Sequence, residues 1–191
     1  MSEFKRTKEV RSLVKKLHNK KIKIVAGLRQ CGKTYLLSEL FYKKIVASKK
    51  VKGEEFIKIF LNGRDKNYRD SINFNLLLEN VSSYAKIIFV DEVQEVNNYH
   101  KILIDYLNDH PGIDIYVTGS NSSTLSKDIV EAFKENGDPI FIQPLTFKEI
   151  RAVKRNYKLD DYLKYGGIPD VVNGKDKEKE IKRIYDQLYK C

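Results

Sequence analysis

Eight residues near the amino terminus have the types and spacing of a loop that binds phosphate. Residues 27–34 read Gly-Leu-Arg-Gln-Cys-Gly-Lys-Thr and fit the Walker A pattern G-x-x-x-x-G-K-[ST]. Glycines let such a loop curl until several backbone N–H groups point at one phosphate, and the following helix adds its positive end. We expect Lys33 to reach the β- and γ-phosphates of a nucleotide and the Thr34 hydroxyl to contact Mg²⁺. The predicted nucleotide-binding residues are Gly27, Leu28, Arg29, Gln30, Cys31, Gly32, Lys33, Thr34 and Tyr35.

Two adjacent carboxylates follow an apolar stretch further along the chain. Residues 86–92 read Lys-Ile-Ile-Phe-Val-Asp-Glu, which has the Walker B form. Asp91 is predicted to hold Mg²⁺ at the end of a strand, and Glu92 to polarise an attacking water as a general base. Acidic residues are common at strand ends, so this pair indicates a site only because the glycine-rich loop precedes it. Together, Lys33 and Glu92 are the predicted catalytic residues, and Thr34 and Asp91 the predicted Mg²⁺ ligands.

Several hydroxyls and an amide lie where a third apolar stretch ends, in Thr-Gly-Ser-Asn-Ser-Ser at residues 118–123. Ligands of open parallel sheets bind beyond the carboxyl ends of the strands. Thr118, Ser120 and Asn121 are therefore candidates for contacting the γ-phosphate or the attacking water. A polar turn that caps the next helix explains the same residues equally well.

Strand-like and helix-like segments alternate along the chain, which predicts an α/β domain with a parallel sheet. Strands are expected at residues 21–26, 55–61, 86–90, 113–118 and 140–143, and helices at 35–46, 68–84, 99–108 and 126–135. Beyond Pro144 the pattern changes to helices at 147–153, 160–165 and 177–190, with a break at 166–169. In the helix at 68–84 we expect Leu76, Leu77 and Leu78 to be buried.

Composition narrows the class of protein. Of 191 residues, 41% are hydrophobic and 32% are charged, which favours a folded core over disorder. No apolar stretch reaches the roughly 18 residues of a membrane span, and the charged amino terminus is unlike a signal peptide, so we expect a cytoplasmic protein without membrane contact. Cys31 and Cys191 form no metal motif, and Cys31 is interpreted as a small side chain that fits the loop. His18, His100 and His110 lack ligand spacing and are expected at the surface.

The net charge of +10 is concentrated at the amino terminus, where residues 1–23 hold nine Lys or Arg against two Glu. A basic arm of this kind can bind nucleic acid or another polyanion. The alternative is a solvated basic helix that packs on the domain, since Val10, Leu13 and Leu17 recur at roughly helical spacing.

The motifs together resemble those of an uncharacterised prokaryotic AAA-type ATPase family. GLRQCGKT, IFVDEVQ, VTGSNS, PLTFKEI and YGGIPDVV occur in the family's order over nearly the whole chain. The resemblance implies a P-loop NTPase three-layer sandwich of the ASCE type, with a parallel five-stranded sheet and a short carboxy-terminal helical segment. It implies that the strand bearing the acids is separated from the loop strand by the fourth strand. It also supports the assignments of the loop, of Asp91 and Glu92, and of a sensor among residues 118–121.

The change of pattern beyond Pro144 places a domain boundary near Gln143, and the resemblance implies that a part is missing. We expect a basic amino-terminal helix at residues 1–20, an ATPase core at 21–143, and at 144–191 the start of a truncated second domain. Members of the family usually carry Gly-Arg before the fifth strand, but residues 133–139 contain no arginine here. Because such an arginine is worth about 10³ to 10⁵ in rate, slow turnover or a partner's arginine is expected. The candidates within the chain are Arg29, Arg64, Arg151 and Arg155.

These residues leave more than one function open. The leading hypothesis is an ATP-binding, Mg²⁺-dependent ATPase that couples its nucleotide state to a partner domain or protein. The alternative is a nucleic-acid-binding protein that uses its basic amino-terminal arm and is regulated by nucleotide. A phosphotransferase fits the acidic pair less well, and a GTPase is disfavoured because no N-K-x-D motif occurs. Selectivity for adenine rests on the resemblance alone.

Overall fold

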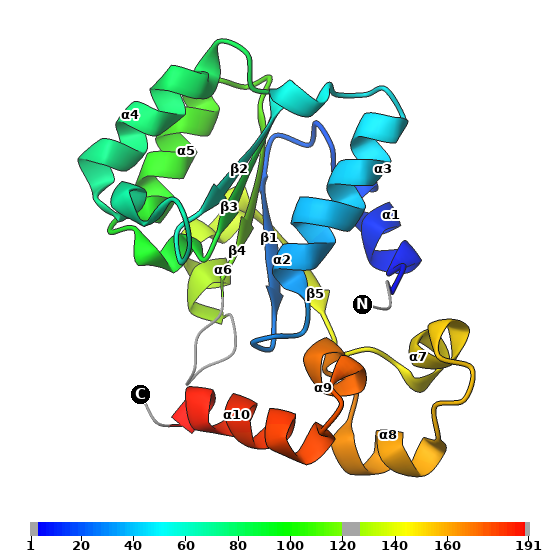
Figure 1. Ribbon diagram of the computed structural model, residues 1–191. Coiled ribbons are helices and arrows are strands. Elements are labelled where there is room, and N and C mark those ends of the chain that lie inside the picture. The colour runs from blue at the N-terminus through cyan, green and yellow to red at the C-terminus, as the bar shows by residue number, and fades with distance from the viewer. Residues whose placement is uncertain (1–3, 120–126, 190–191) are drawn as a thin grey trace.

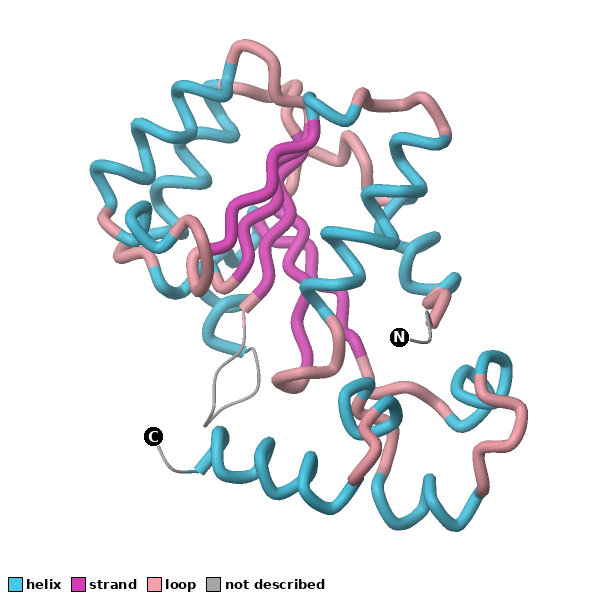
Figure 2. The backbone as a smooth tube through the Cα atoms, viewed as in Figure 1, coloured by secondary structure: helices cyan, strands magenta, loops and turns pink. Residues whose placement is uncertain are grey.

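Five parallel strands form the centre of the molecule (Figures 1 and 2). The computed structural model describes residues 4–119 and 127–189. The strands are β1 (Ile22–Gly27), β2 (Phe56–Phe60), β3 (Ile87–Asp91), β4 (Asp114–Thr118) and β5 (Gly137–Ile142). Their order across the sheet is β2-β3-β4-β1-β5. The strand that ends in Asp91 is therefore separated from the loop strand β1 by β4, as the resemblance implies.

Helices cover both faces of the sheet and make the fold a three-layer sandwich (Figure 1). On one face lie α4 (Ser71–Ser82), α5 (Tyr99–Asp109) and α6 (Lys127–Phe133). On the other face α1 (Thr7–Lys15) lies beside a helix of residues 33–47. That helix is continuous through α2 (Lys33–Tyr35), a π-helical stretch (Leu36–Phe41) and α3 (Tyr42–Ala47). Because both faces are covered, β3 and β4 are buried along their whole length.

The remaining helices form a small layer beside the carboxyl ends of the strands (Figure 1). They are α7 (Phe147–Val153), α8 (Leu159–Tyr165), α9 (Pro169–Asn173) and α10 (Lys177–Tyr189). A separate apolar cluster holds this layer together, and Phe4 reaches into it from the amino terminus. The backbone N–H of Leu145 donates to the Gly167 carbonyl at 2.8 Å, and a Cβ at Gly167 would lie 1.8 Å from the Leu145 carbonyl oxygen. Glycine at position 167 thus lets the two segments approach.

Short 3₁₀ turns complete the described secondary structure, at Gly53–Glu55, Lys66–Arg69, Val93–Glu95 and Lys134–Asn136.

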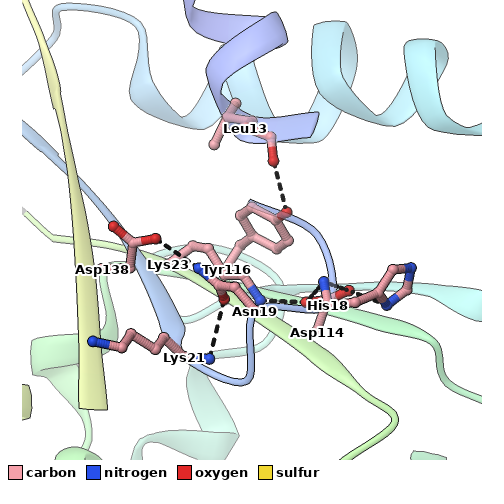
Figure 3. Close-up of polar contacts among 8 residues, drawn as sticks. All are labelled: Leu13, His18, Asn19, Lys21, Lys23, Asp114, Tyr116 and Asp138. Atoms are coloured by element: carbon pink, nitrogen blue, oxygen red, sulfur yellow. Dashed lines mark hydrogen bonds and ion pairs between the residues drawn. The ribbon is translucent and has the colours of Figure 1, made fainter. Parts of the chain in front are cut away.

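A polar cluster at the amino-terminal edge of the sheet fixes α1 in place (Figure 3). Lys23 of β1 is fully buried and forms an ion pair with Asp114 of β4. The Asp114 carboxylate also accepts the backbone N–H of His18, at 3.0 and 3.1 Å to its two oxygens. The Tyr116 hydroxyl donates to the Leu13 carbonyl at 3.1 Å. Burial raises the pKa of Tyr116, so this hydroxyl remains a donor.

One expectation about burial is wrong. All three leucines of residues 76–78 were expected to be buried. Leu78 is buried in α4, but Leu76 is 57% exposed and Leu77 is partly exposed. Successive residues of a helix point about 100° apart, so three in a row cannot share one buried face.

Several boundaries also differ from the expected ones, and α4 begins at Ser71 rather than at Tyr68. β5 begins at Gly137 rather than at Ile140 and includes Pro139. An edge strand tolerates proline because its outer N–H has no partner strand, and β5 pairs with β1 alone. The break expected at residues 166–169 is followed by α9, whose first residue, Pro169, suits the first turn of a helix.

Candidate functional site

The glycine-rich loop connects β1 to the helix of residues 33–47 at the carboxyl edge of the sheet (Figure 1). Gly27 has φ 153° and Gly32 has φ 93°, conformations that other residues rarely adopt. A Cβ at Gly27 would lie 2.3 Å from the Ile142 carbonyl oxygen of β5. The two glycines of the motif are therefore required by the backbone, and the loop has the strand–loop–helix context that a phosphate-binding loop needs.

Lys33 lies over its own loop. Its side chain is 5% exposed, and its Nζ donates to the carbonyls of Gly27 at 3.1 Å and Leu28 at 3.0 Å. Among the residues that the structure describes, no carboxylate lies within ion-pair distance of this ammonium group. A lysine ammonium is a compact charge that binds phosphate well, and here it has only neutral partners.

Three elements meet at Asp91, the last residue of β3. The Thr34 hydroxyl donates to Asp91 Oδ1 at 2.8 Å, and the Thr118 hydroxyl of β4 donates to the same oxygen at 2.6 Å. The backbone N–H of Glu92 in turn donates to Thr118 Oγ1 at 3.0 Å. Burial raises the pKa of Asp91, although the two hydroxyl donors oppose this by favouring the charged carboxylate. The carboxylate predicted to hold a metal thus lies beside the loop hydroxyl predicted to share it.

Glu92 leaves the end of β3 in a left-handed conformation, with φ 57°. This turn directs its side chain into the pocket that Lys33 and Thr34 also line. Glu92 Oε2 accepts a hydrogen bond from Gln94 Nε2 at 2.6 Å, which holds the carboxylate in place. A partly exposed carboxylate at this position can orient a water molecule, as a general base must.

The pocket above the loop encloses about 300 Å³. Residues 30–35 of the loop and helix form one wall with Glu92. Phe4, Leu145 and Pro169 also line the pocket, together with the polar side chains of Asp170 and Asn173. The lining therefore combines charged and apolar residues, which suits a ligand with an anionic and an aromatic part.

Arg6 is a pocket residue that the sequence analysis did not single out. It is 7% exposed, and its guanidinium donates to the Cys31 carbonyl at 2.9 Å and to the Gln143 carbonyl at 2.7 Å. Within the described ranges it has no carboxylate partner. No spacing rule could have found it, because Arg6 is far from the loop in sequence and looks like one more residue of the basic arm.

The four arginines named from the sequence, Arg29, Arg64, Arg151 and Arg155, do not line this pocket. Arg64 instead pairs with Asp65 beside β2.

The polar residues after β4 are described only in part. Thr118 is fully buried and contacts Asp91 and Glu92, so its position at the strand end is as expected. Ser120 and Asn121 lie outside the described residues, and their candidacy as sensors stays a prediction.

In the part of the chain that the structure describes, the other residue types considered from the sequence form no second site. Cys31 is fully buried and burial raises the pKa of its thiol, which suits a packed side chain rather than a nucleophile. Within residues 4–119 and 127–189, no group of three His, Cys, Asp or Glu side chains could hold a metal ion by itself. No described helix is long and apolar enough to cross a membrane.

Comparison with known proteins identifies relatives in archaea and bacteria. A family model described as an AAA domain matches residues 19–151. An uncharacterized protein of Methanocaldococcus jannaschii is 31% identical over 196 residues, which cover 89% of this chain and 41% of that protein. An uncharacterized protein of Haemophilus influenzae is 31% identical over 185 residues, covering 87% of this chain and 44% of that protein. The chain spans less than half the length of these relatives.

Solved structures share the fold at low sequence identity. A DNA polymerase III gamma subunit-related protein of Thermotoga maritima has a TM-score of 0.55 at 10% identity, with 93% of this chain and 58% of that chain covered. Domain III of the Thermotoga maritima replication initiation protein DnaA has a TM-score of 0.52 at 14% identity, with coverages of 96% and 85%. Hsp104 of Saccharomyces cerevisiae, in a casein complex, has a TM-score of 0.53 at 15% identity, with coverages of 84% and 30%.

Proposed function

The chain belongs to the AAA domain family, and from this membership we propose that it binds ATP together with Mg²⁺ and hydrolyses the γ-phosphate. An AAA-type P-loop domain is a nucleotide-binding domain, and the strand order of this sheet is that of such a domain. ATP as the nucleotide is inferred from the family, and Mg²⁺ as the metal and hydrolysis as the reaction from the chemistry of the pocket.

The 2.8 Å hydrogen bond between Thr34 Oγ1 and Asp91 Oδ1 carries the proposal. Mg²⁺ is usually held in nucleotide sites by one or two protein oxygens, with phosphate and water oxygens completing the octahedron. A hydroxyl and a carboxylate that already meet beside Lys33 are a donor set of this kind. The residues therefore fit Mg²⁺ delivered with a nucleotide, and no larger group of protein ligands is needed.

Lys33 and Glu92 have the positions that hydrolysis requires. Lys33 contacts neutral carbonyls at present, so a phosphate that displaced them would gain a buried cation. Glu92 lines the same pocket and could hold the attacking water in line with the γ-phosphorus. When bound, Mg²⁺ would neutralise charge that develops on the phosphate oxygens. Thr118 would act as a positioning residue, because it holds both Asp91 and the Glu92 backbone.

Arg6 supplies a second positive charge to the pocket. Its two hydrogen bonds join the phosphate loop to the end of β5, so it holds the loop in shape. A buried guanidinium without a carboxylate partner favours an anionic ligand nearby. We assign Arg6 a positioning role at the loop. The charge-neutralising arginine of the reaction would then come from a partner, which predicts slow turnover by the isolated chain.

The apolar residues that line the pocket support a nucleotide over a free phosphate. Pro169 and the mostly buried Phe4 offer apolar contacts to a planar base, and Asn173 offers an amide that can hydrogen-bond to its edge. Pro169 and Asn173 belong to α9, so a bound base would contact the carboxy-terminal helical layer directly. We propose that this contact passes the nucleotide state to a partner domain or protein attached through residues 144–191.

Calorimetric titration with ATP and with GTP, each with and without Mg²⁺, tests the proposal alongside an assay of phosphate release. Mg²⁺-dependent binding of ATP is expected, and Lys33→Ala should abolish it because the phosphates lose their principal cation. Binding without measurable phosphate release would support the nucleotide site and contradict hydrolysis by the isolated chain. Equal binding of both nucleotides would contradict the choice of ATP, and no binding of either would contradict the whole proposal.

A further inference from the structure

The net positive charge of the chain is concentrated in its first 53 residues. They contain 16 Lys and Arg against three Glu, a net charge of +13, whereas residues 54–191 contain 20 Lys and Arg against 23 Asp and Glu, a net charge of −3. In the fold this segment supplies β1, the phosphate loop and the helical layer on one face of the sheet (Figure 1). Most of the net positive charge therefore lies in this part of the molecule, and residues 144–191, with 12 Lys and Arg against eight Asp and Glu, add a smaller net charge of +4.

Helix α1 points a row of cations at solvent. Lys8, Arg11 and Lys15 are exposed and are spaced three and four residues apart, so they lie on one face of the helix. On the opposite face Val10 and Leu13 are buried against the helix of residues 33–47. The exposed residues Lys5, Lys20 and Lys21 extend the row before and after the helix.

The neighbouring helix and the segment after it add a second group of cations. Lys43, Lys44, Lys49, Lys50 and Lys52 are all exposed. Residues 48–55 lead into β2 and residues 16–21 lead into β1, and both strands begin at the same edge because the sheet is parallel. With three strand spacings between β1 and β2, about 14 Å separates their starts. We call the two groups together the basic surface.

Carboxylates do not neutralise the basic surface. Between residues 4 and 53 the chain has only Glu9 and Glu39, and neither is fully exposed. Lys43 pairs with Glu39 at 3.6 Å. Lys16, directly after α1, pairs with Asp138 of β5. Among the described residues, the exposed cations of the surface other than Lys43 have no carboxylate within ion-pair distance. A concentration of like charge repels itself and attracts a polyanion.

The side chains of the basic surface distinguish between polyanions. Helices that lie in a membrane interface expose apolar residues, but the apolar face of α1 is already buried. Protein interfaces are depleted in lysine, whereas lysine supplies nearly all of this surface. Single strands stack on aromatic side chains, but the exposed aromatic residue in 4–53 is Tyr35, which lines the nucleotide pocket. Point charges without stacking groups match the phosphates of a duplex.

We propose that the basic surface, formed by α1 with its flanking residues and by residues 43–52, binds double-stranded nucleic acid through its phosphates without reading bases. The surface is preorganised, since Arg6 ties the start of α1 to the phosphate loop, and Tyr116 and Asp114 hold its end to the sheet (Figure 3). Binding of this kind depends on salt and does not depend on hydrolysis of a nucleotide.

Fluorescence anisotropy with a labelled DNA duplex tests the proposal on the chain as it stands. The logarithm of the affinity should fall linearly with the logarithm of the salt concentration between about 50 and 200 mM KCl. The triple variant Lys8→Glu, Arg11→Glu, Lys15→Glu removes about three phosphate contacts, so the slope should flatten by about 2.7 and the affinity at 0.1 M salt should fall about 100-fold or more. A second triple variant, Lys49→Glu, Lys50→Glu, Lys52→Glu, alters a loop rather than a helix and should act in the same direction.

The matched control is Lys101→Glu, Lys148→Glu, Lys158→Glu, which changes the net charge equally at exposed positions outside the basic surface. It should retain most of the duplex affinity, and melting curves and ATP titration should show that all three variants are folded. Four results would overturn the proposal. They are no duplex binding at low salt, an equal loss in the control, tighter binding of single strands of equal charge, and equal competition by polyglutamate.

Discussion

Thr34 Oγ1 and Asp91 Oδ1 lie 2.8 Å apart, so the residue after the phosphate-loop lysine is hydrogen-bonded to the carboxylate that ends β3. Fifty-seven residues separate them in sequence, and they meet because β1 and β3 are parallel and end at the same edge of the sheet. Thr118 holds the same carboxylate oxygen from β4, the strand between them. The ends of β3 and β4 and the start of the helix that follows β1 therefore supply one polar centre beside Lys33.

This geometry predicts that the Thr34 hydroxyl is needed for metal-dependent binding. Thr34→Val keeps the shape of the side chain but removes the hydroxyl. The increase in ATP affinity that Mg²⁺ causes should therefore become about 10- to 100-fold smaller, as is typical when a residue that supports a metal site is replaced. Thr34→Ser restores the hydroxyl and is the matched control. Calorimetry with and without Mg²⁺ measures the gain. If Thr34→Val keeps the full gain, the hydroxyl is not part of the metal site.

Glu92→Gln should separate binding from turnover. The amide keeps the size of the side chain and can still accept from Gln94, but it cannot take a proton from water. We expect phosphate release to fall by about 10² to 10⁴, the usual contribution of a general base, with the ATP affinity nearly unchanged. An unchanged rate of phosphate release would show that another group activates the water.

Arg6 should stabilise both the fold and the nucleotide site. Arg6→Met removes two hydrogen bonds to buried or partly buried carbonyls, and each such bond from a charged group is worth about 1.5 to 3 kcal/mol. The melting temperature and the ATP affinity should both fall. Arg6→Lys keeps the positive charge but lacks the planar guanidinium with its several N–H donors. It should therefore recover only part of the melting temperature and part of the ATP affinity. Full recovery with lysine would mean that charge alone matters here.

The contrast between the loop and Arg6 shows what the sequence could predict. The loop is local, because its glycines, lysine and threonine lie within eight residues between a strand and a helix, with the spacing that the phosphate-binding pattern requires. Asp91 was predictable for a similar reason, since a buried strand ends there. Arg6 reaches its site through the packing of α1 on the helix of residues 33–47, and no local pattern encodes that packing.

The apolar residues that line the pocket could not be predicted from the sequence for the same reason. Phe4, Leu145 and Pro169 come from distant parts of the chain and meet only through the packing of the carboxy-terminal helices. α9 itself has a local signal, because a proline after an extended residue often begins a helix. Its neighbouring glycines, Gly166 and Gly167, indicate a break more strongly than Pro169 indicates a start.

Lys23 provides a prediction for the dependence of stability on pH. Burial lowers the pKa of Lys23 from its ordinary 10.5, although the ion pair with Asp114 opposes this. The other groups that face Lys23 are Asp138 of β5, Lys16 after α1 and the Tyr116 ring of β4. Between the lowered pKa and 10.5 the unfolded chain binds more protons than the folded one, so the Lys23 contribution to the free energy of unfolding rises with pH.

The test compares wild type with Lys23→Met in denaturant titrations at neutral and alkaline pH. At neutral pH the variant should be less stable by about 3 to 5 kcal/mol, because Asp114 is left as a buried charge without its partner. The difference in free energy of unfolding between wild type and Lys23→Met should increase as the pH approaches 10.5. Wild type gains stability there because Lys23 becomes neutral in the folded chain, and the variant does not. Lys21→Met, at an exposed position, is the control and should show a constant difference. If the difference for Lys23→Met decreases with rising pH, the pKa of Lys23 is raised by Asp114, and the ion pair outweighs the cost of burial.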